Sequence, residues 1–467
     1  MSTPVSLTFT DDQHAALKAH LFPGDGLEAV AFIACGRAAG NDRHRLVART
    51  LHLIPHERCR RTPSSVNWQA EDILLLLDQA EVDCLSLVKV HSHPGGYPKF
   101  SRVDDARDRE LLPTIRSWVE ADVPHGSAIM LPDGSMFGRH LWRGSRMQDF
   151  NLINVVGPDL RFWWRDDPRT PDKAFAASQD QAFGEGTTRR MSRLRIAVVG
   201  ASGTGSPVIE QLMRLGVGKL ALVDDDVLEN RNLNRILFAT ARQAKQGMEK
   251  VKAAKLDIRR KGLGTKVTAI AKEVGAAEAL RAISESDILF GCVDTARGRF
   301  LMNLAATTYN LAYFDLGILL DAQQDGAERG RIKDILGTIH YLVPGRSSLI
   351  SRGAFTLSDV SEEVIAKQDP QAHAQQVEDK YLKGLQVRRP AVVSVNMFAA
   401  SLAVNDLLAR LHPYRRQPNE EIASIEFSLA ELRLTADEEM GACPIMAPLV
   451  GRGDQRLWLG LPELGEL

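Results

Sequence analysis

The chain has 467 residues, more than one ordinary domain usually holds, so two or three domains are expected. Its hydrophobic content of 44% and charged content of 25% are typical of a globular protein in water. The net charge of -1 argues against general electrostatic binding to nucleic acid or to a membrane surface.

The cysteines and the N-terminus indicate a reducing compartment. The five cysteines show no CxxC spacing, and their odd number argues against a complete disulfide framework. They are Cys35, Cys59, Cys84, Cys292 and Cys443. The first residues, MSTPVSLTFTDDQ, lack the basic start and apolar core of a signal peptide, and no apolar run is long enough to span a bilayer. We therefore expect a cytoplasmic protein that does not enter a membrane.

The first region, residues 1–155, is predicted to mix helices and strands. In chain order the expected elements are helix 11–21, strand 28–35, strand 46–53, helix 68–80, strand 85–91 and helix 103–117, followed by short strands. This order favours an α/β domain with a largely antiparallel or mixed sheet.

The rest of the chain is divided into a linker, a second domain and a tail. Residues 156–193 form the predicted linker, because most of this stretch is polar and contains prolines. Residues 194–435 alternate strands with helices, which is typical of a doubly wound, Rossmann-like parallel sheet, and residues 436–467 are the tail. The expected elements of this domain are strands 193–200, 220–224 and 287–294 and helices 245–261 and 390–411.

Two histidines end an apolar strand in the first region, in the sequence LSLVKVHSHP. Alternate residues of a strand share a face, so His91 and His93 point the same way and can bind one Zn²⁺. Asp104 would add an oxygen ligand and leave the fourth position for water, as in catalytic zinc sites. Paired histidines at a strand end are often only surface residues. Ser101 with Asp104 also fits a helix capping box, a role that can coexist with metal binding.

The complete arrangement of His-x-His-Pro, then Ser101, then Asp104 three residues later resembles the JAMM signature of the JAB/MPN metalloprotease family. The resemblance covers roughly residues 10–145 and implies a JAB/MPN-type α/β fold. It implies that Glu28 is the general base and that Ser101 steadies the oxyanion, although Glu28 alone would be interpreted as a solvated carboxylate. The implied activity is hydrolysis of an amide or isopeptide bond next to the C-terminus of a ubiquitin-like protein.

A glycine-rich loop follows the first strand of the second domain. Gly200, Gly203 and Gly205 lie between a strand and a helix, where backbone N–H groups and the helix N-terminus favour a phosphate. Asp224 ends the next strand, at the position of a ribose-binding acid. Up to this point an NAD-dependent dehydrogenase would have the same pattern.

The residues that follow favour a different nucleotide enzyme. Asp226 lies in an acidic strand end, and Asn232 and Arg235 follow in Asn-Leu-x-Arg, which resembles the ThiF/MoeB and ubiquitin-activating enzyme family. The resemblance implies a ThiF-type fold in which Arg235 and Lys250 bind the triphosphate of ATP and Asp294 holds Mg²⁺. The implied reaction joins the C-terminal carboxylate of a ubiquitin-like protein to AMP and releases pyrophosphate, through positioning and charge neutralisation.

Two departures from that family concern the transfer step. Segment 310–390 contains no cysteine, although ubiquitin-activating enzymes usually carry their acyl-accepting cysteine there. Ser348 and Ser351 stand where many relatives have a CxxC pair of a structural zinc site, so no structural zinc is expected. Cys443 is then either a transfer nucleophile or a remnant of that site, and direct transfer of the adenylate to a partner's cysteine is the other possibility.

Together the resemblances imply a bifunctional enzyme of a bacterial ubiquitin-like pathway that uses Zn²⁺, ATP and Mg²⁺. Fusions of these two domains occur in bacterial operons, some of which resemble antiphage defence systems. The expected partners are a ubiquitin-like protein with a C-terminal glycine, a conjugating-enzyme-like protein and a second copy in a homodimer. The alternatives are sulfur-carrier activation and processing for cofactor or cysteine biosynthesis, and a binding or regulatory protein with one or both sites inactive.

Overall fold

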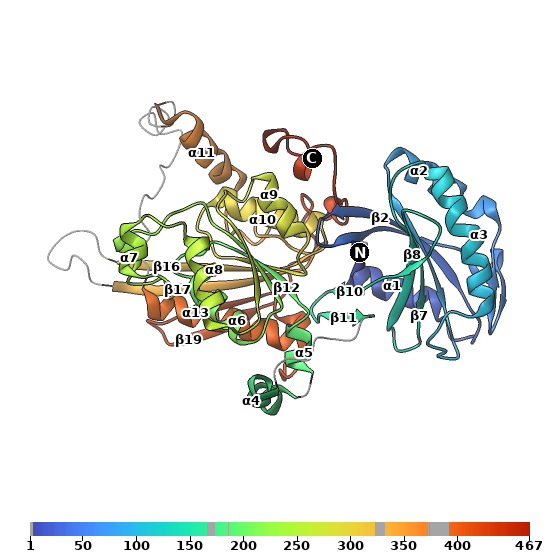
Figure 1. Ribbon diagram of the computed structural model, residues 1–467, viewed down its shortest axis with the longest axis horizontal. Coiled ribbons are helices and arrows are strands. Elements are labelled where there is room, and N and C mark those ends of the chain that lie inside the picture. The colour runs from blue at the N-terminus through green and yellow to red at the C-terminus, as the bar shows by residue number, and fades with distance from the viewer. Residues whose placement is uncertain (1–2, 166–172, 185, 323–331, 372, 374–391) are drawn as a thin grey trace. The chain divides into compact units, whose positions relative to one another are not determined.

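The computed structural model is organised as two compact units (Figure 1). It describes residues 3–165, 173–184, 186–322, 332–371, 373 and 392–467. The first unit comprises residues 1–167, 308–310 and 449–467, and the second comprises 168–307 and 311–448. Within the described part of the chain, no helix has the length and apolar character needed to cross a membrane.

The first unit is built on a mixed sheet of nine strands in the order β11-β10-β1-β3-β2-β6-β7-β8-β9. Its strands are β1 (Val5–Thr10), β2 (Val30–Ala39), β3 (His44–Leu53), β6 (Ser86–Ser92), β7 (His125–Met130), β8 (Met136–Leu141), β9 (Gln148–Asp149), β10 (Leu152–Val156) and β11 (Arg161–Trp164). A separate hairpin consists of β4 (Arg60–Thr62) and β5 (Ser65–Asn67). Its helices are α1 (Asp11–Leu21), α2 (Leu74–Val82) and α3 (Arg102–Val119).

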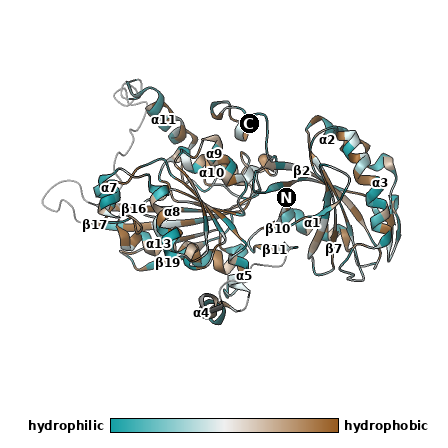
Figure 2. Ribbon diagram, viewed as in Figure 1, coloured by the Kyte–Doolittle hydropathy of each residue, from teal (hydrophilic) through white to brown (hydrophobic). Residues whose placement is uncertain are grey.

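Alternation along strand β2 explains how both faces of this sheet are covered. Ala31 and Ile33 pack in a core that also contains Leu17 of α1, whereas Val30 and Phe32 pack in a second core that contains residues of α2 and α3. Figure 2 shows the corresponding apolar colouring along the strands. The predicted α/β domain with a mixed sheet is confirmed.

Most of the predicted elements of the first unit are present, but the strands β1, β4 and β5 were missed. Helix 11–21 coincides with α1, and the helix predicted from 103 to 117 is α3, which extends to Val119. The longest of these is β1, whose six residues are all buried; the strand pairs in parallel with both β3 and β10. Residues 449–467 also belong to this unit, where Gly453 bridges to Arg37 at the end of β2.

The second unit contains an eight-stranded sheet in the order β14-β13-β12-β15-β16-β17-β18-β19. Its strands are β12 (Arg195–Val199), β13 (Lys219–Val223), β14 (Lys266–Ile270), β15 (Ile288–Gly291), β16 (Ala312–Ala322), β17 (Ile332–Leu342), β18 (Ser424–Ser428) and β19 (Arg433–Asp437). Strands β14 to β16 pair in parallel, and β16 to β19 pair antiparallel. The chain moves outward from β12 first through β13 and later through β15, so the topological switch point lies between β12 and β15.

Helices connect these strands and confirm the doubly wound pattern. They are α4 (Lys173–Phe183), α5 (Thr187–Met191), α6 (Gly205–Arg214), α7 (Ala241–Lys245), α8 (Lys250–Lys261), α9 (Ala277–Ser284), α10 (Ala296–Thr308), α11 (Leu357–Gln368) and α13 (Val393–Leu411). The segment predicted as a linker, 156–193, contains β11, α4 and α5, while its residues 166–172 and 185 lie outside the described residues. The helix predicted over 245–261 is α8 alone, and α7 ends where it was expected to begin.

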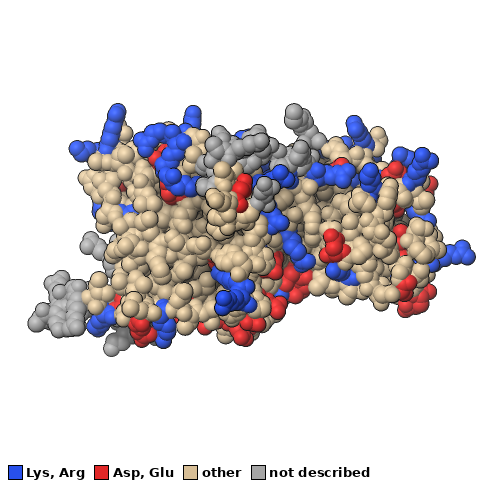
Figure 3. All heavy atoms as spheres, turned by 90° about the horizontal axis from the view of Figure 1, so that it is seen from below, with Lys and Arg blue, Asp and Glu red and all other residues tan. Residues whose placement is uncertain are grey.

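Lys and Arg (blue) and Asp and Glu (red) both occur on the face seen in Figure 3, amid the tan surface of other residues. This mixture agrees with the near-zero net charge of the sequence.

Candidate metal and nucleotide sites

Three buried side chains of the first unit converge at the end of β6. One ligand atom from each of His91, His93 and Asp104 lies within 4.8 Å of the other two. His91 Nε2 is 3.1 Å from Asp104 Oδ1, and His93 Nε2 is 3.6 Å from Asp104 Oδ2. The histidines lie at alternate positions at the end of β6, and Asp104 lies in the first turn of α3. The predicted metal ligands are therefore brought together by two elements.

The donor set fits Zn²⁺. Among the described residues His91 Nδ1 has no hydrogen-bond partner, and Nε2 faces only the carboxylate of Asp104. Burial lowers the pKa of His91 to about 4, so the ring is neutral, as a metal ligand must be. The other histidine, His93, bonds through Nδ1 to the carbonyl of Tyr97 at 2.8 Å, which leaves Nε2 facing Asp104. Burial opposes ionisation of Asp104, but His91, His93 and Ser101 hold the pKa of its carboxyl well below its usual range.

Ser101 and Asp104 form the capping box that begins helix α3. The backbone N–H of Ser101 donates to Asp104 Oδ2 at 2.7 Å, and the Asp104 N–H donates to Ser101 Oγ at 3.1 Å. The cap therefore fixes the carboxylate that faces the histidines. The hydroxyl of Ser101 accepts a hydrogen bond in this cap, and its side chain also helps to keep Asp104 ionised.

Glu28 lies beside these residues at the start of β2. Its neighbours in the sheet place it there, since Val30 pairs with His91 and the Ala29 N–H donates to Ser92 Oγ at 2.9 Å. The Glu28 side chain is buried, and burial raises the pKa of its carboxyl to about 7. A carboxylate poised near neutrality is suited to accept a proton from water.

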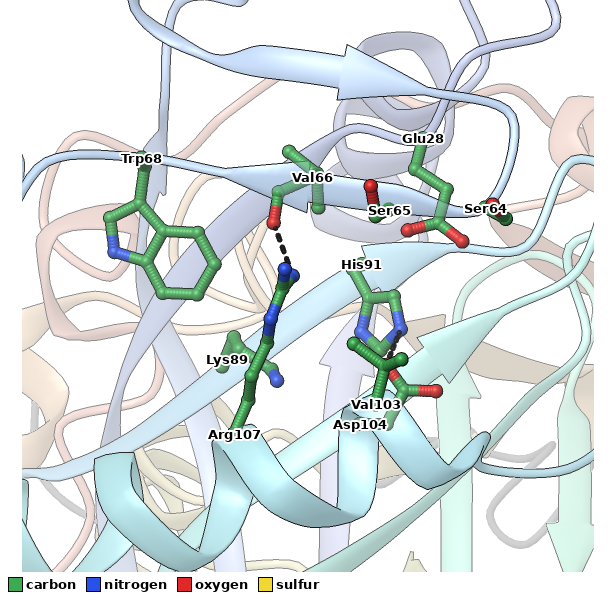
Figure 4. Close-up of a pocket in the computed structure, with 10 residues that line it drawn as sticks. All are labelled: Glu28, Ser64, Ser65, Val66, Trp68, Lys89, His91, Val103, Asp104 and Arg107. Carbon is green, nitrogen blue, oxygen red and sulfur yellow. Dashed lines mark hydrogen bonds and ion pairs between the residues drawn. The ribbon is translucent and has the colours of Figure 1, made fainter.

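A pocket opens next to the Glu28 carboxylate, and Figure 4 shows Glu28, His91 and Asp104 around it. The β4–β5 hairpin supplies part of its wall. Arg107, one turn after Asp104 on α3, crosses the pocket and donates to the carbonyl of Val66 at 2.8 Å. The hairpin is thereby tied to the helix that carries the carboxylate ligand.

Beneath the pocket, three charged side chains form a buried network. Asp108, which is fully buried, contacts Lys89 Nζ at 2.5 Å and Arg139 Nη2 at 2.7 Å. Burial opposes ionisation of Asp108, but the two cations keep the pKa of its carboxyl low. The network fastens α3 to β6 and β8, so it holds Asp104 in register with the histidines.

In the second unit, the glycine loop connects β12 to α6 at the switch point. A Cβ on Gly205 would lie 1.8 Å from the carbonyl oxygen of Gly200, so only glycine fits this turn. Asp224 Oδ2 accepts a hydrogen bond from the Ala201 N–H at 2.6 Å, which fixes the carboxylate to the loop. Burial raises the pKa of Asp224.

The predicted phosphate-binding residues lie around this loop. Lys250 Nζ is 2.5 Å from Asp226 Oδ2 and 3.6 Å from Asp224 Oδ1, so its charge is balanced by two carboxylates. Asn232 Oδ1 accepts from the Glu229 N–H at 2.9 Å and fixes the turn before Arg235. The Arg235 side chain passes the loop, because its Cδ would be 3.2 Å from a Cβ on residue 203.

Asp294 lies at the same edge of the sheet, just after β15. Strands β12 and β15 pair in parallel, so their carboxyl ends meet, and a Cβ on Gly200 would lie 2.5 Å from the carbonyl of Cys292. Asp294 is exposed and lies two residues before the start of α10. The first N–H groups of this helix, of Ala296 and Arg297, donate to the carboxylate of Glu363 on α11 at 2.9 and 2.8 Å.

Cys443 lies in a buried cluster with Ser348 and Ser351. As a whole residue, Cys443 is 1% exposed. Burial opposes ionisation, but hydrogen bonds from Ser348, from the N–H groups of Ile445 and Met446, and from Ser351 lower the pKa of Cys443. In this conformation the thiol is closed to a protein substrate, and the two serines occupy positions beside it.

Comparison with known families decides the identity of the second unit. The model of the ThiF family matches residues 177–438, more than half of the chain. The chain belongs to the ThiF family. A second model, of prokaryotic homologues of the JAB domain, matches residues 10–145. The predicted fusion of the two domains is therefore confirmed.

Several known proteins resemble the ThiF part. The adenylyltransferase and sulfurtransferase UBA4 of Candida glabrata is 31% identical over 24% of this chain and 26% of its own length. The ubiquitin-like modifier-activating enzyme 5 of Drosophila virilis is 32% identical over 32% of this chain and 37% of its own length. The chain thus spans well under half of these relatives. The structure of E. coli MccB with ATP has a TM-score of 0.43 and 18% identity, and covers 59% of this chain and 74% of that chain.

Some residues that contribute to the two sites of this ThiF-family protein were not predicted from its sequence. Lys89 lies two residues before His91, and a lysine inside an apolar strand is a signal of a buried ion pair. Asp108 lies four residues after Asp104 and shares its helix face. A third residue, Asn396, interrupts the apolar face of α13 and packs against the glycine loop. Nothing in the sequence around Arg107 predicts its hydrogen bond to the β4–β5 hairpin.

Proposed function

We propose that this chain is a bifunctional enzyme of a bacterial ubiquitin-like pathway. Its second unit adenylates the C-terminal carboxylate of a ubiquitin-like protein with ATP and Mg²⁺. Its first unit hydrolyses an amide or isopeptide bond next to such a C-terminus with the help of Zn²⁺. The observation that carries the proposed adenylation is the ThiF match together with the gathering of Asp224, Arg235 and Lys250 around the glycine loop. The proposed hydrolysis is supported by the convergence of His91, His93 and Asp104.

In the adenylation step, an oxygen of the substrate carboxylate attacks the α-phosphorus of ATP. The bond from that phosphorus to the bridging oxygen breaks, and pyrophosphate leaves. The N–H groups of the glycine loop and the start of α6 hold phosphate oxygens. Lys250 exchanges its contact with Asp226 for the triphosphate, Arg235 neutralises further charge, and Asp224 is placed for the ribose. Asp294 would hold Mg²⁺, which when bound offsets the charge of the phosphates.

In the hydrolytic step, Glu28 accepts a proton from the attacking water and returns it to the leaving amine. Ser101 donates its hydroxyl proton to the oxyanion. His91, His93 and Asp104 would hold the metal, and when bound Zn²⁺ polarises the scissile carbonyl and acidifies the water. Arg107 and the β4–β5 hairpin form the wall against which the substrate chain lies.

The first test is pyrophosphate exchange with ATP, Mg²⁺ and a ubiquitin-like protein that ends in glycine. The wild type should catalyse exchange, and Asp294→Ala should abolish it. Exchange that survives this substitution would refute the magnesium role of Asp294.

For the other unit, the metal content of purified protein should be about one zinc per chain and should fall in His91→Ala/His93→Ala. Equal zinc in the two proteins would refute the metalloprotease half.

We further propose that the adenylate passes directly to a partner of the conjugating-enzyme type, and that Cys443 is structural. Burial of its thiol beside Ser348 and Ser351 supports this assignment. Cys443→Ala should retain pyrophosphate exchange and transfer to the partner. A thiol-sensitive adduct of the ubiquitin-like protein on the wild type, absent from Cys443→Ala, would instead make Cys443 the transfer nucleophile.

Sulfur-carrier activation is a second candidate, because one relative is named as both an adenylyltransferase and a sulfurtransferase. The two candidates share the adenylate and differ in its fate. A thiocarboxylate product would favour sulfur transfer, and an isopeptide-linked product would favour conjugation.

We propose that the chain works as a homodimer, which light scattering would detect as twice the chain mass of 51.5 kDa.

A further inference from the structure

Asn396 is a polar residue on the buried side of α13, the helix that packs against α6. It is 3% exposed, and its neighbours on this face are apolar, among them Val395, Ala399 and Ala400. An asparagine in such a place loses hydration on both its N–H₂ and its carbonyl, so it normally finds hydrogen-bond partners in the protein. Its side chain therefore requires an explanation that packing alone does not give.

The side-chain nitrogen of Asn396 has no such partner. Nδ2 is buried and has no hydrogen-bond acceptor among the described residues. Another asparagine on the same helix differs in this respect, since Asn405 Nδ2 donates to the Ser401 carbonyl at 2.8 Å. A buried donor without an acceptor destabilises the state that contains it, which suggests that an acceptor reaches Asn396 in another state of the protein.

The donor is aimed at the glycine loop. A Cβ on Gly203 would lie 2.5 Å from Asn396 Nδ2, so the amide rests on the backbone of this residue, and Gly203 is needed because any side chain would meet it. Arg235 passes the same point, with its Cδ 3.2 Å from that Cβ position. The amide thus lies against the loop that leads into helix α6, next to a residue assigned to the triphosphate.

The orientation of the loop peptides connects this amide with nucleotide binding. When backbone N–H groups of a loop converge on a phosphate, the carbonyls of the same peptides turn to the opposite side. Asn396 Nδ2 lies against the loop at Gly203 and can donate to a loop carbonyl that turns toward α13. A hydrogen bond there would hold the N–H groups toward the phosphates.

We propose that Asn396 is a positioning residue for the nucleotide: its side-chain N–H₂ donates to the backbone of the glycine loop at Gly203 when ATP is bound, and so fixes the loop around the triphosphate. The proposal rests on the proposed adenylation and extends it to a residue on α13. In this proposal the unpartnered amide destabilises the free protein, and its hydrogen bond stabilises the complex with ATP.

The experiment compares ATP affinity with the stability of the free protein. Mg²⁺–ATP is titrated by calorimetry into wild type, Asn396→Ala and Asn396→Asp, and the melting temperature of each is measured without nucleotide. Asn396→Ala should weaken ATP binding by about tenfold, as the loss of one hydrogen bond requires. Its melting temperature without ATP should equal or exceed that of the wild type. Asn396→Asp should bind ATP more weakly than Asn396→Ala, because it replaces the donor with a negative charge near the phosphates.

Asn405→Ala, on the same helix, is the matched control and should bind ATP like the wild type. ATP affinity of Asn396→Ala within twofold of the wild type would overturn the proposal. So would a fall in its melting temperature with unchanged affinity, since both results assign Asn396 to packing alone. If Asn396→Ala does not fold, Asn396→Ser, which keeps a small donor, should restore both folding and ATP affinity. Absence of ATP binding in the wild type would instead overturn the proposed adenylation itself.

Discussion

The two candidate sites are assembled in different ways. In the first unit the metal ligands come from the short stretch 91–104, on the end of one strand and the first turn of one helix. In the second unit the residues around the glycine loop are drawn from 200–294 and lie on loops and helix starts at the edge of a parallel sheet. The first site is held by buried side-chain contacts. In the second, Lys250 is balanced by Asp224 and Asp226 in the absence of a triphosphate.

This difference indicates how each site meets its ligand. A metal ion is small and needs fixed donors, so the ligands can be set by a capping box and a buried ion network before the ion arrives. A triphosphate is large and highly charged, so its site must exchange internal ion pairs for new ones when it binds. We therefore expect substitutions in the first unit to affect catalysis or folding strongly, and those in the second to affect nucleotide affinity by smaller factors.

A large catalytic effect without loss of the metal is expected for Glu28→Gln. The amide keeps the size of the side chain but cannot accept a proton from water, so hydrolysis should fall by about 10²- to 10⁴-fold. Zinc content should stay at the wild-type level, whereas His91→Ala should lose both zinc and hydrolysis. Hydrolysis of Glu28→Gln within tenfold of the wild type would remove Glu28 from the role of general base.

The largest effect on stability is expected for Asp108→Ala. This change leaves Lys89 and Arg139 buried without their shared carboxylate, which should lower the free energy of unfolding of the first unit by about 3–5 kcal/mol. Urea denaturation followed by tryptophan fluorescence measures it. The matched control is Asp122→Ala, which removes an ion pair of exposed side chains to Arg143 and should change stability little. Equal effects of the two substitutions would contradict the role of the buried network.

A smaller effect is expected for Lys250→Ala in the second unit. Its removal deletes a positive charge for the triphosphate and leaves two carboxylates, Asp224 and Asp226, near the phosphates, so the Kd for Mg²⁺–ATP should rise about tenfold. Lys252→Ala is the matched control, because Lys252 pairs with Glu249 and is largely exposed on the same helix. If both variants bind ATP like the wild type, Lys250 has no part in holding the nucleotide.

The sequence predicted those features that depend on local spacing. The alternation of His91 and His93 on a strand and the three-residue spacing of Ser101 and Asp104 are local patterns, and the structure brings these residues together. The doubly wound order was likewise visible in the alternation of strands and helices. Strand β1 was missed because it was considered only as a possible signal segment, although its VSLTFT sequence alternates apolar and polar residues.

The remaining features depend on contacts between distant segments. The bond from Arg107 to Val66 joins residues 41 positions apart, and the contact of Asn396 with Gly203 joins α13 to the glycine loop. The burial of Cys443 beside Ser348 likewise follows from tertiary packing. No local spacing specifies which of many distant segments will meet, so such neighbours require the structure.

The central claim, that one chain carries two separate chemistries, is tested most directly by measuring both activities on two single-site variants. Pyrophosphate exchange and hydrolysis of a ubiquitin-like fusion are assayed for wild type, Asp294→Ala and Glu28→Gln. Asp294→Ala should lose exchange and keep hydrolysis, and Glu28→Gln should lose hydrolysis and keep exchange. Loss of both activities in either folded variant, or absence of either activity from the wild type, would contradict the claim.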